Sequence, residues 1–173
     1  RGNYRTDFDC FVGVDRGSLW VLEEDLPLTL AVGDFDSVTA DERQLIQKRA
    51  QHFVQAQPEK DDTDLELALL TIFEQNPQAQ VTIFGALGGR IDHMLANVFL
   101  PSNPKLAPYM RQIAIEDGQN LIAYCPEGTS QLEPRLDYDY LAFMPVRDSQ
   151  LTIIGAKYEL TEANFFFKKV YAS

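Results

Sequence analysis

The first hundred or so residues alternate between short apolar runs and helical patterns, and this alternation restricts the fold more than any other feature. The apolar runs expected to form strands are 8–14, 28–32, 53–56 and 81–84. Helical patterns follow them, and two of the helices open with capping-box spacing, Thr39 with Glu42 and Thr63 with Glu66. Alternating strands and helices form parallel βαβ units with right-handed crossovers. We therefore predict an N-terminal α/β domain with a mostly parallel, Rossmann-like sheet.

The pattern changes after about Gln112. Short runs rich in β-branched and aromatic residues follow one another, separated by turn signals such as Asp117-Gly118 and Gly155. Strands that repeat at spacings of roughly ten residues, without helical patterns between them, favour an antiparallel sandwich or barrel. We predict two domains, an α/β domain over residues 1–112 and an all-β sandwich domain over residues 113–173.

Charge and cysteine content limit the partners. The net charge of −11 would repel a nucleic-acid backbone and an anionic membrane surface, so neither is expected as a partner. No apolar run approaches the ~18 residues of a membrane span. Cys10 and Cys125 lie in apolar contexts without CxxC spacing, which predicts buried, reduced thiols in a cytoplasmic protein. A polyphosphate remains a possible ligand, because metal ions can neutralise the opposing charges.

Charged residues gather where the predicted strands end. Ligands of parallel sheets bind beyond these carboxyl ends, so the charged groups are expected on one rim of one sheet. Their mutual repulsion would destabilise the domain unless cations were bound. The rim residues, in strand order, are Asp15, then Asp34 and Asp36, then Asp61, Asp62 and Asp64, then Arg90 and Asp92.

The central rim segment is Val32-Gly33-Asp34-Phe35-Asp36-Ser37. In an extended segment Asp34 and Asp36 project to the same side, and paired carboxylates suit Mg²⁺. A polar turn that only caps backbone amides explains these six residues equally well. Asp64 could likewise complement its helix dipole, and Asp61 and Asp62 could be solvated.

The fourth junction carries glycines and a cation. Gly85, Gly88 and Gly89 lie between a strand and a helix, where free amides suit a phosphate, although the spacing matches no standard phosphate loop. Arg90 is predicted to bind a phosphate oxygen, and the alternative is a structural salt bridge to Asp92. Together with the aspartates, this set of residues favours phosphoryl-type transfer.

Four motifs, in their order and spacing, resemble the thiamine pyrophosphokinase family: Asp15-Arg16-Gly17, Gly33-Asp34-Phe35-Asp36-Ser37, Asp61-Asp62-Thr63-Asp64 and Gly88-Gly89-Arg90-Ile91-Asp92-His93. Pro126-Glu127-Gly128 and the segment 155–160 resemble its C-terminal domain. The resemblance implies transfer of a diphosphoryl group from ATP to the hydroxyl of thiamine, with Mg²⁺, giving AMP. It also implies a homodimer with active sites between subunits.

The resemblance also implies roles for individual residues. Asp34, Asp36 and Asp64 match metal-site positions, and Asp15 matches an acid near the substrate hydroxyl. The nucleotide side would comprise Asp61, Thr63, Gly88, Gly89, Arg90, Asp92 and His93, and the thiamine side Asp15, Tyr158 and Ser173. The family usually has a further strand and a glycine-rich turn ahead of Arg1, and its late Ser-Asn motif would begin at Ser173. We therefore expect pieces at both ends to lie outside this sequence.

The assembly prediction also rests on one strand of the second half. Residues Phe165-Phe166-Phe167 break the in–out alternation of a strand with one wet face, so at least one ring is expected to need cover from another chain.

Two other functions stay open from the residues alone. In a DxD-type nucleotide-sugar transferase, Asp34 and Asp36 would hold a metal on a nucleoside diphosphate. In a non-catalytic two-domain binding protein, the rim acids would be solvated.

Overall fold

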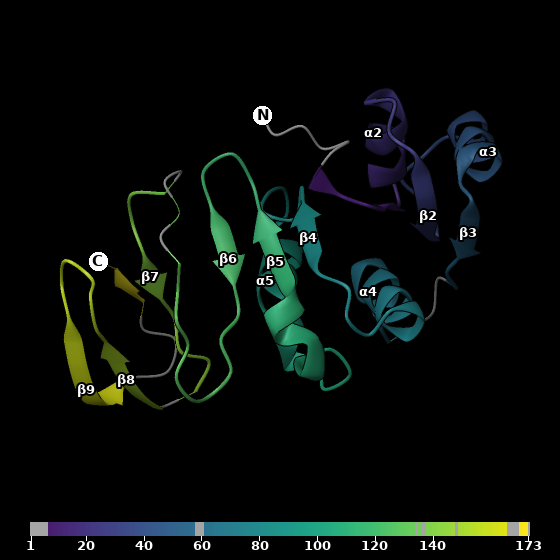
Figure 1. Cartoon of the computed structure of the whole chain (residues 1–173). Coiled ribbons are helices and arrows are strands. Elements are labelled where there is room, and N and C mark those ends of the chain that lie inside the picture. The colour runs from purple at the N-terminus through teal and green to yellow at the C-terminus, as the bar shows by residue number, and fades with distance from the viewer. Residues whose placement is uncertain are drawn as a thin grey trace. The chain divides into compact units, whose positions relative to one another are not determined.

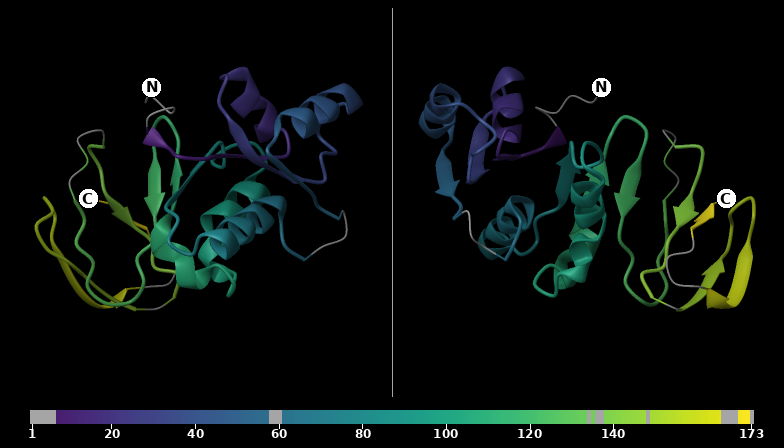
Figure 2. Two further views of the ribbon diagram at one scale, coloured as in Figure 1. Left: turned by 45° about the vertical axis from the view of Figure 1, so that its right-hand side comes forward. Right: turned by 180° about the vertical axis from the view of Figure 1, so that it is seen from behind.

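The parallel sheet forms around one buried strand, β2 (Leu28–Gly33). It pairs in parallel with β1 (Phe11–Val14) on one side and β3 (His52–Gln55) on the other. All its residues except Thr29 are buried, because helices cover both faces of the sheet. Helices α2 (Gly17–Glu23) and α3 (Ala40–Arg49) pack on one face, and α4 (Asp64–Gln75) packs on the other (Figures 1 and 2).

Helix α4 also packs against a second sheet. Its Ala68 contacts Leu30 and Val32 of β2, whereas its Leu69 and Phe73 belong to a separate core cluster. That cluster is completed by residues of β4 and β5, including Ile83 and Ile115. The second sheet has the order β4 (Val81–Phe84), β5 (Ile113–Glu116) and β6 (Leu121–Ala123), and β4 connects to β5 through α5 (Ile91–Val98), η1 (Leu100–Ser102) and η2 (Ala107–Gln112).

The computed structural model describes residues 7–57, 61–133, 135, 138–147, 149–165 and 170–172. It divides the chain into two units, residues 1–128 and 129–173. The second unit is β-rich, as predicted: β8 (Ser149–Ile153) pairs antiparallel with β9 (Leu160–Phe165), and β7 (Ala142–Phe143) pairs antiparallel with β10 (Tyr171–Ala172). In the described part of the chain, no helix is long and apolar enough to cross a membrane.

The structure divides the chain after Gly128, whereas the sequence places the boundary after residue 112. Strand β5 pairs in parallel with β4, and β6 closes a hairpin on β5. Long-range pairing therefore assigns residues 113–128 to the first unit.

Two expectations were wrong. Within the described residues, β4 pairs with β5 and not with any strand of the β1–β2–β3 sheet, so the four junctions do not share one sheet. Cys10, which precedes β1, and Cys125, which follows β6, are free but exposed, not buried as predicted.

Candidate active site

Three of the predicted carboxylates come together. Asp15, Asp34 and Asp64 each offer an oxygen, and these atoms lie within 4.8 Å of one another. Asp15 follows β1, Asp34 follows β2, and Asp64 is the first residue of α4. The carboxyl ends of two adjacent parallel strands and the start of a helix on the sheet thus place the three groups side by side. All three are half-buried, so their charges are only partly screened by solvent.

The turn after β1 places the Asp15 carboxylate beside those of Asp34 and Asp64. Its backbone N–H donates to Val32 O at 2.9 Å, which continues the pairing of β1 with β2 by one residue. Its φ of 46° then ends the strand, and its carboxylate Oδ1 accepts a hydrogen bond from Phe35 N–H at 3.2 Å. A positive φ is unfavourable for a residue with a side chain, so the surrounding bonds must hold this conformation in place.

Gly33 leaves the space that the Asp15 carboxylate occupies. A Cβ atom at position 33 would lie 1.9 Å from Asp15 Oδ1 and 2.8 Å from its Cγ. A side chain larger than hydrogen would therefore displace the carboxylate. The glycine of the central segment is required by this close approach.

The environment of Asp15 shifts its protonation. Burial raises the pKa of Asp15 to about 6, and the nearby charges of Asp64, Asp34 and Asp36 act in the same direction. The hydrogen bond from Phe35 N–H opposes the increase in pKa but does not cancel it. Asp15 is thus mostly ionised at neutral pH, and its pKa is close enough to neutral pH for the carboxylate to accept a proton. Both properties suit a general base.

The period-two argument for Asp34 and Asp36 requires an extended segment, and the segment is not extended. Phe35 has a φ of 60°, so the extended conformation ends before Asp36. Its ring is buried and stacks on Phe53, with centroids 4.7 Å apart, which fixes the turn. Asp34 Oδ1 accepts a hydrogen bond from Asp36 N–H at 3.1 Å, and the exposed Asp36 lies outside the close group.

The acids around the start of α4 have different environments. Thr63 caps α4 and forms the predicted capping box with Glu66. Asp62 is not merely solvated: Lys105 Nζ donates to its Oδ2 at 2.6 Å, and this hydrogen bond lowers the pKa of Asp62. Asp61 is exposed. Only Asp64 of this segment joins the carboxylate group.

Arg90 forms the alternative interaction considered from the sequence. Its Nε and a terminal nitrogen donate to Asp92 at 3.1 Å and 2.6 Å, a bidentate pair with both side chains largely exposed. Asp92 Oδ1 also accepts from His93 N–H at 3.0 Å. The pair follows Gly88 and Gly89, and Gly89 has a φ of 73°, which favours glycine.

Tyr158 and Ser173 are the predicted thiamine residues of the second half. Tyr158 is exposed, and Lys157 Nζ lies 5.3 Å from its ring centroid. Ser173, Phe166 and Phe167, together with the side chain of Phe165, lie outside what the structure describes.

Sequence reasoning gave no role to two cations near these acids. Arg16 donates to Ser37 O at 3.3 Å and lies 3.9 Å from Glu42, so it links the turn after β1 to the turn after β2. Its position beside Asp15 could have indicated this. Lys105 contacts Asp62 across 43 residues of sequence, and no local pattern indicates that contact.

Comparison with known proteins adds independent findings. Residues 3–109 match the family model described as "Thiamin pyrophosphokinase, catalytic domain", and residues 129–173 match "Thiamin pyrophosphokinase, vitamin B1 binding domain". The second match begins where the structure divides the chain.

Relatives and solved structures agree with those matches. A curated thiamine pyrophosphokinase of Bacillus subtilis is 36% identical over 163 residues, which cover 93% of this chain and 75% of the relative. A crystal structure of a thiamin pyrophosphokinase family protein from Enterococcus faecalis is 45% identical, with a TM-score of 0.93 over 98% of this chain and 80% of the other. The Geobacillus thermodenitrificans enzyme is 34% identical, with a TM-score of 0.78 over 96% and 78%.

Proposed function

The chain belongs to the thiamin pyrophosphokinase family, and on that basis we propose how its residues divide the work of the reaction. The enzyme transfers a diphosphoryl group from ATP to thiamine. The hydroxyl oxygen of thiamine forms a bond to the β-phosphorus, the bond from that phosphorus to the α–β bridging oxygen breaks, and AMP leaves. The hydroxyl proton must be accepted by a base, and the charge on the phosphates must be neutralised.

The close group of Asp15, Asp34 and Asp64 is the observation that supports this assignment most strongly. A donor set made only of carboxylate oxygens is suited to a hard cation such as Mg²⁺, which also takes phosphate oxygens and water as ligands. Asp34 and Asp64 would hold the ion, and Asp36 would add charge beside them, directly or through water. Bound there, Mg²⁺ would neutralise charge that develops on the transferred phosphates.

Asp15 is proposed to accept the proton of the thiamine hydroxyl. Its pKa of about 6 lies closer to neutral pH than that of an ordinary aspartate, so the carboxylate is a stronger base and is still largely ionised at neutral pH. Its carboxylate accepts a hydrogen bond from Phe35 N–H and occupies the space that Gly33 leaves, so its direction is fixed before substrate binds.

The nucleotide is proposed to bind beside the loop from β4 to α5. Arg90 is largely exposed although it is paired with Asp92, so its remaining N–H groups can reach a phosphate oxygen. In this arrangement Asp92 orients the guanidinium, and Gly88 and Gly89 let the phosphates approach the backbone. Asp61, Thr63 and His93 would line the same side.

Incubation with ATP, Mg²⁺ and thiamine is expected to yield AMP and thiamine diphosphate in equal amounts. Nucleotide products can be separated by ion-exchange chromatography, with reactions lacking thiamine or containing EDTA as controls. Release of ADP instead would contradict diphosphoryl transfer. AMP formation that does not depend on thiamine would contradict the assigned acceptor.

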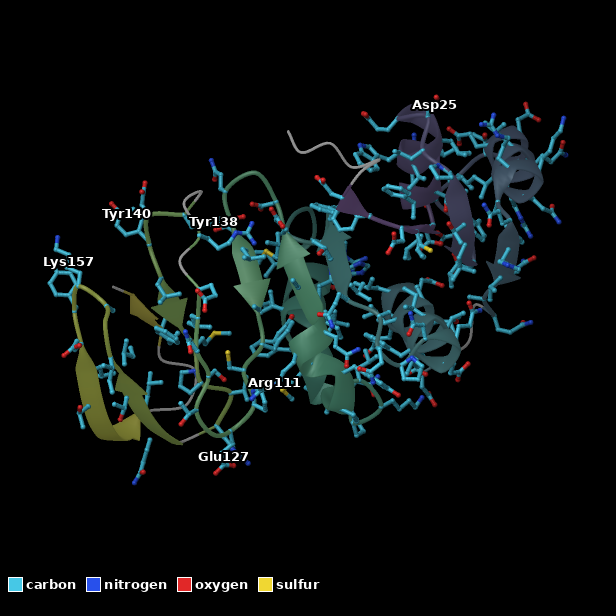
Figure 3. The ribbon with its side chains drawn as sticks, viewed as in Figure 1. Asp25, Arg111, Glu127, Tyr138, Tyr140 and Lys157 are labelled. Carbon is cyan, nitrogen blue, oxygen red and sulfur yellow. The ribbon has the colours of Figure 1, made fainter. Side chains whose placement is uncertain are left out.

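We also propose that the working unit is a homodimer in which the β-rich unit contributes to thiamine binding. The second unit exposes large apolar side chains, among them Tyr140, Val146 and Ile154, which are 86%, 64% and 84% exposed. Tyr140 projects away from the ribbon (Figure 3). So much exposed apolar surface on so small a unit favours cover by another chain. Tyr158 and Ser173 would belong to the thiamine side.

Sedimentation equilibrium at micromolar concentration is expected to give twice the mass of the chain, because dimer formation would cover these side chains. A variant carrying Tyr140→Ser and Ile154→Ser should shift the equilibrium toward monomer. A fully active wild-type monomer would exclude shared active sites.

A cytoplasmic location is proposed as well, because two free and exposed thiols suit a reducing compartment.

A further inference from the structure

Four polar side chains form a network beside the start of α4. Lys105 Nζ donates to Asp62 Oδ2 at 2.6 Å. Asn103 Nδ2 donates both to Asp62 Oδ1, at 3.3 Å, and to Glu66 Oε1, at 2.9 Å. The other Glu66 oxygen accepts from Thr63 N–H at 2.8 Å in the capping box. The network therefore holds residues on both sides of Asp64 in sequence.

The segment that supplies Asn103 and Lys105 is itself firmly attached. It lies between Leu100 and Leu106, which are 2% and 0% exposed and belong to the core cluster that also contains Leu69 and Phe73 of α4. Asn103 N–H donates to Leu100 O, and Asn103 O accepts from Leu106 N–H. Lys105 N–H donates to Asn103 Oδ1 at 3.0 Å. Both side chains thus project from a segment with little freedom to move.

The start of α4 needs such an attachment. Asp64 must stay close to Asp15 and Asp34 although the three carboxylates repel one another in the absence of a cation. The fully buried anchors of the helix, Ala68, Leu69 and Phe73, lie at least a turn beyond Asp64, whereas Leu65 and Leu67 of the first turn pack against the core only partly buried. Contacts at its first turn therefore decide where the Asp64 carboxylate stands before a metal ion binds.

We propose that Lys105, with Asn103, is a positioning residue for the metal site: it holds Asp62 and Glu66 so that Asp64 is pre-organised beside Asp15 and Asp34. This inference rests on the proposed function, since it concerns the same metal site. Lys105 touches neither the carboxylate group nor any reacting atom and acts through the backbone of the first turn. Its ion pair is half-exposed, with Lys105 57% and Asp62 24% exposed, and such pairs contribute little to folding. Its effect should therefore appear in metal affinity more than in stability.

The test compares Lys105→Met, Lys105→Arg and the control Lys48→Met in the full chain. Lys48 is exposed in the last turn of α3, so its replacement changes the net charge equally at a distance from the network. Binding of Mn²⁺ to the metal-free protein is measured by isothermal titration calorimetry without ATP. Thermal unfolding in EDTA and the Mg²⁺ concentration for half-maximal AMP formation are measured in parallel.

Lys105→Met is expected to weaken Mn²⁺ binding by about tenfold, the lower end of what outer-shell changes cost a metal site. The Mg²⁺ concentration for half-maximal rate should rise equally, while the rate at saturating Mg²⁺ changes less than twofold. Lys105→Arg should restore most of the affinity, and Lys48→Met should resemble the wild type.

A double change gives a second criterion. If Lys105 acts through Asp62, then Asp62→Asn combined with Lys105→Met should weaken Mn²⁺ binding no more than Lys105→Met alone. Unchanged affinity in Lys105→Met, or an equal loss in Lys48→Met, would overturn the proposal, as would a lower melting temperature with intact metal binding. Absence of AMP formation by the wild type would instead contradict the proposed function, and Mn²⁺ binding would still decide the positioning role.

Discussion

Asp64→Asn is expected to lower kcat/KM for ATP by about 10³-fold, or about 4 kcal/mol of transition-state stabilisation. The substitution keeps the shape of the side chain at the first position of α4 but removes one of the three charges that lie within 4.8 Å of one another. The remaining two carboxylates would hold a divalent cation much less tightly. The loss should therefore be only partly recovered at high Mg²⁺.

The matched control is Asp41→Asn, which removes an exposed charge from the first turn of α3. Both variants are compared by steady-state AMP formation over a range of Mg²⁺ concentrations, with circular dichroism as a check on folding. Asp41→Asn should retain activity within twofold. Turnover of Asp64→Asn close to the wild type at saturating Mg²⁺ would remove Asp64 from the metal site.

Asp15→Asn should lower kcat by about 10²- to 10⁴-fold, the range that general base catalysis contributes, and at the same time stabilise the metal-free protein at pH 8. The amide oxygen can still accept the hydrogen bond from Phe35 N–H, so the turn is retained. The charge that burial and the neighbouring carboxylates disfavour is gone. Loss of activity together with a gain in stability distinguishes a base from a structural residue.

The sign of the pH dependence follows from the direction of the shift. Because the pKa of Asp15 is raised from 3.8 to about 6 on folding, the neutral form favours the folded state at low pH, and this contribution is lost as the pH rises through about 6. Melting temperatures in EDTA should therefore differ most between the wild type and Asp15→Asn near pH 8 and converge near pH 4. The wild-type kcat/KM should fall below about pH 6. A difference in melting temperature that is constant from pH 4 to 8 would contradict the raised pKa.

Local sequence signals predicted local structure well. Both capping boxes, at Thr39 and at Thr63, form as their spacing indicates, because every bond in them joins residues three apart. Asp15 and Asp34 also lie close together, as expected for residues that follow the carboxyl ends of parallel strands, because β1 and β2 pair directly. The order of strands and helices therefore predicted that two of the three close carboxylates would be neighbours.

Features that depend on backbone dihedrals or distant contacts were not predicted. The sequence argument placed Asp34 and Asp36 on one side of an extended segment, in which side chains alternate. The positive φ of Phe35 ends the extended conformation between them. The place of β5 beside β4, and hence the domain division, follows from a pairing across some thirty residues that apolar runs alone do not specify. Lys105 was missed for the same reason, because its partner is fixed by the packing of Leu100 and Leu106.

The close approach of Gly33 to Asp15 also restricts how this sequence can vary. A substitution at position 33 would push the carboxylate of Asp15 aside, whereas a chain with a smaller residue at position 15 would leave room for a side chain at position 33. The two positions are therefore coupled, so the effect of a change at one depends on the residue at the other. If the Asp15 carboxylate were lost, position 33 could accept a larger residue, and once such a residue filled the space, the carboxylate could not return by a single mutation. For this chain, loss of Asp15 would then be difficult to reverse.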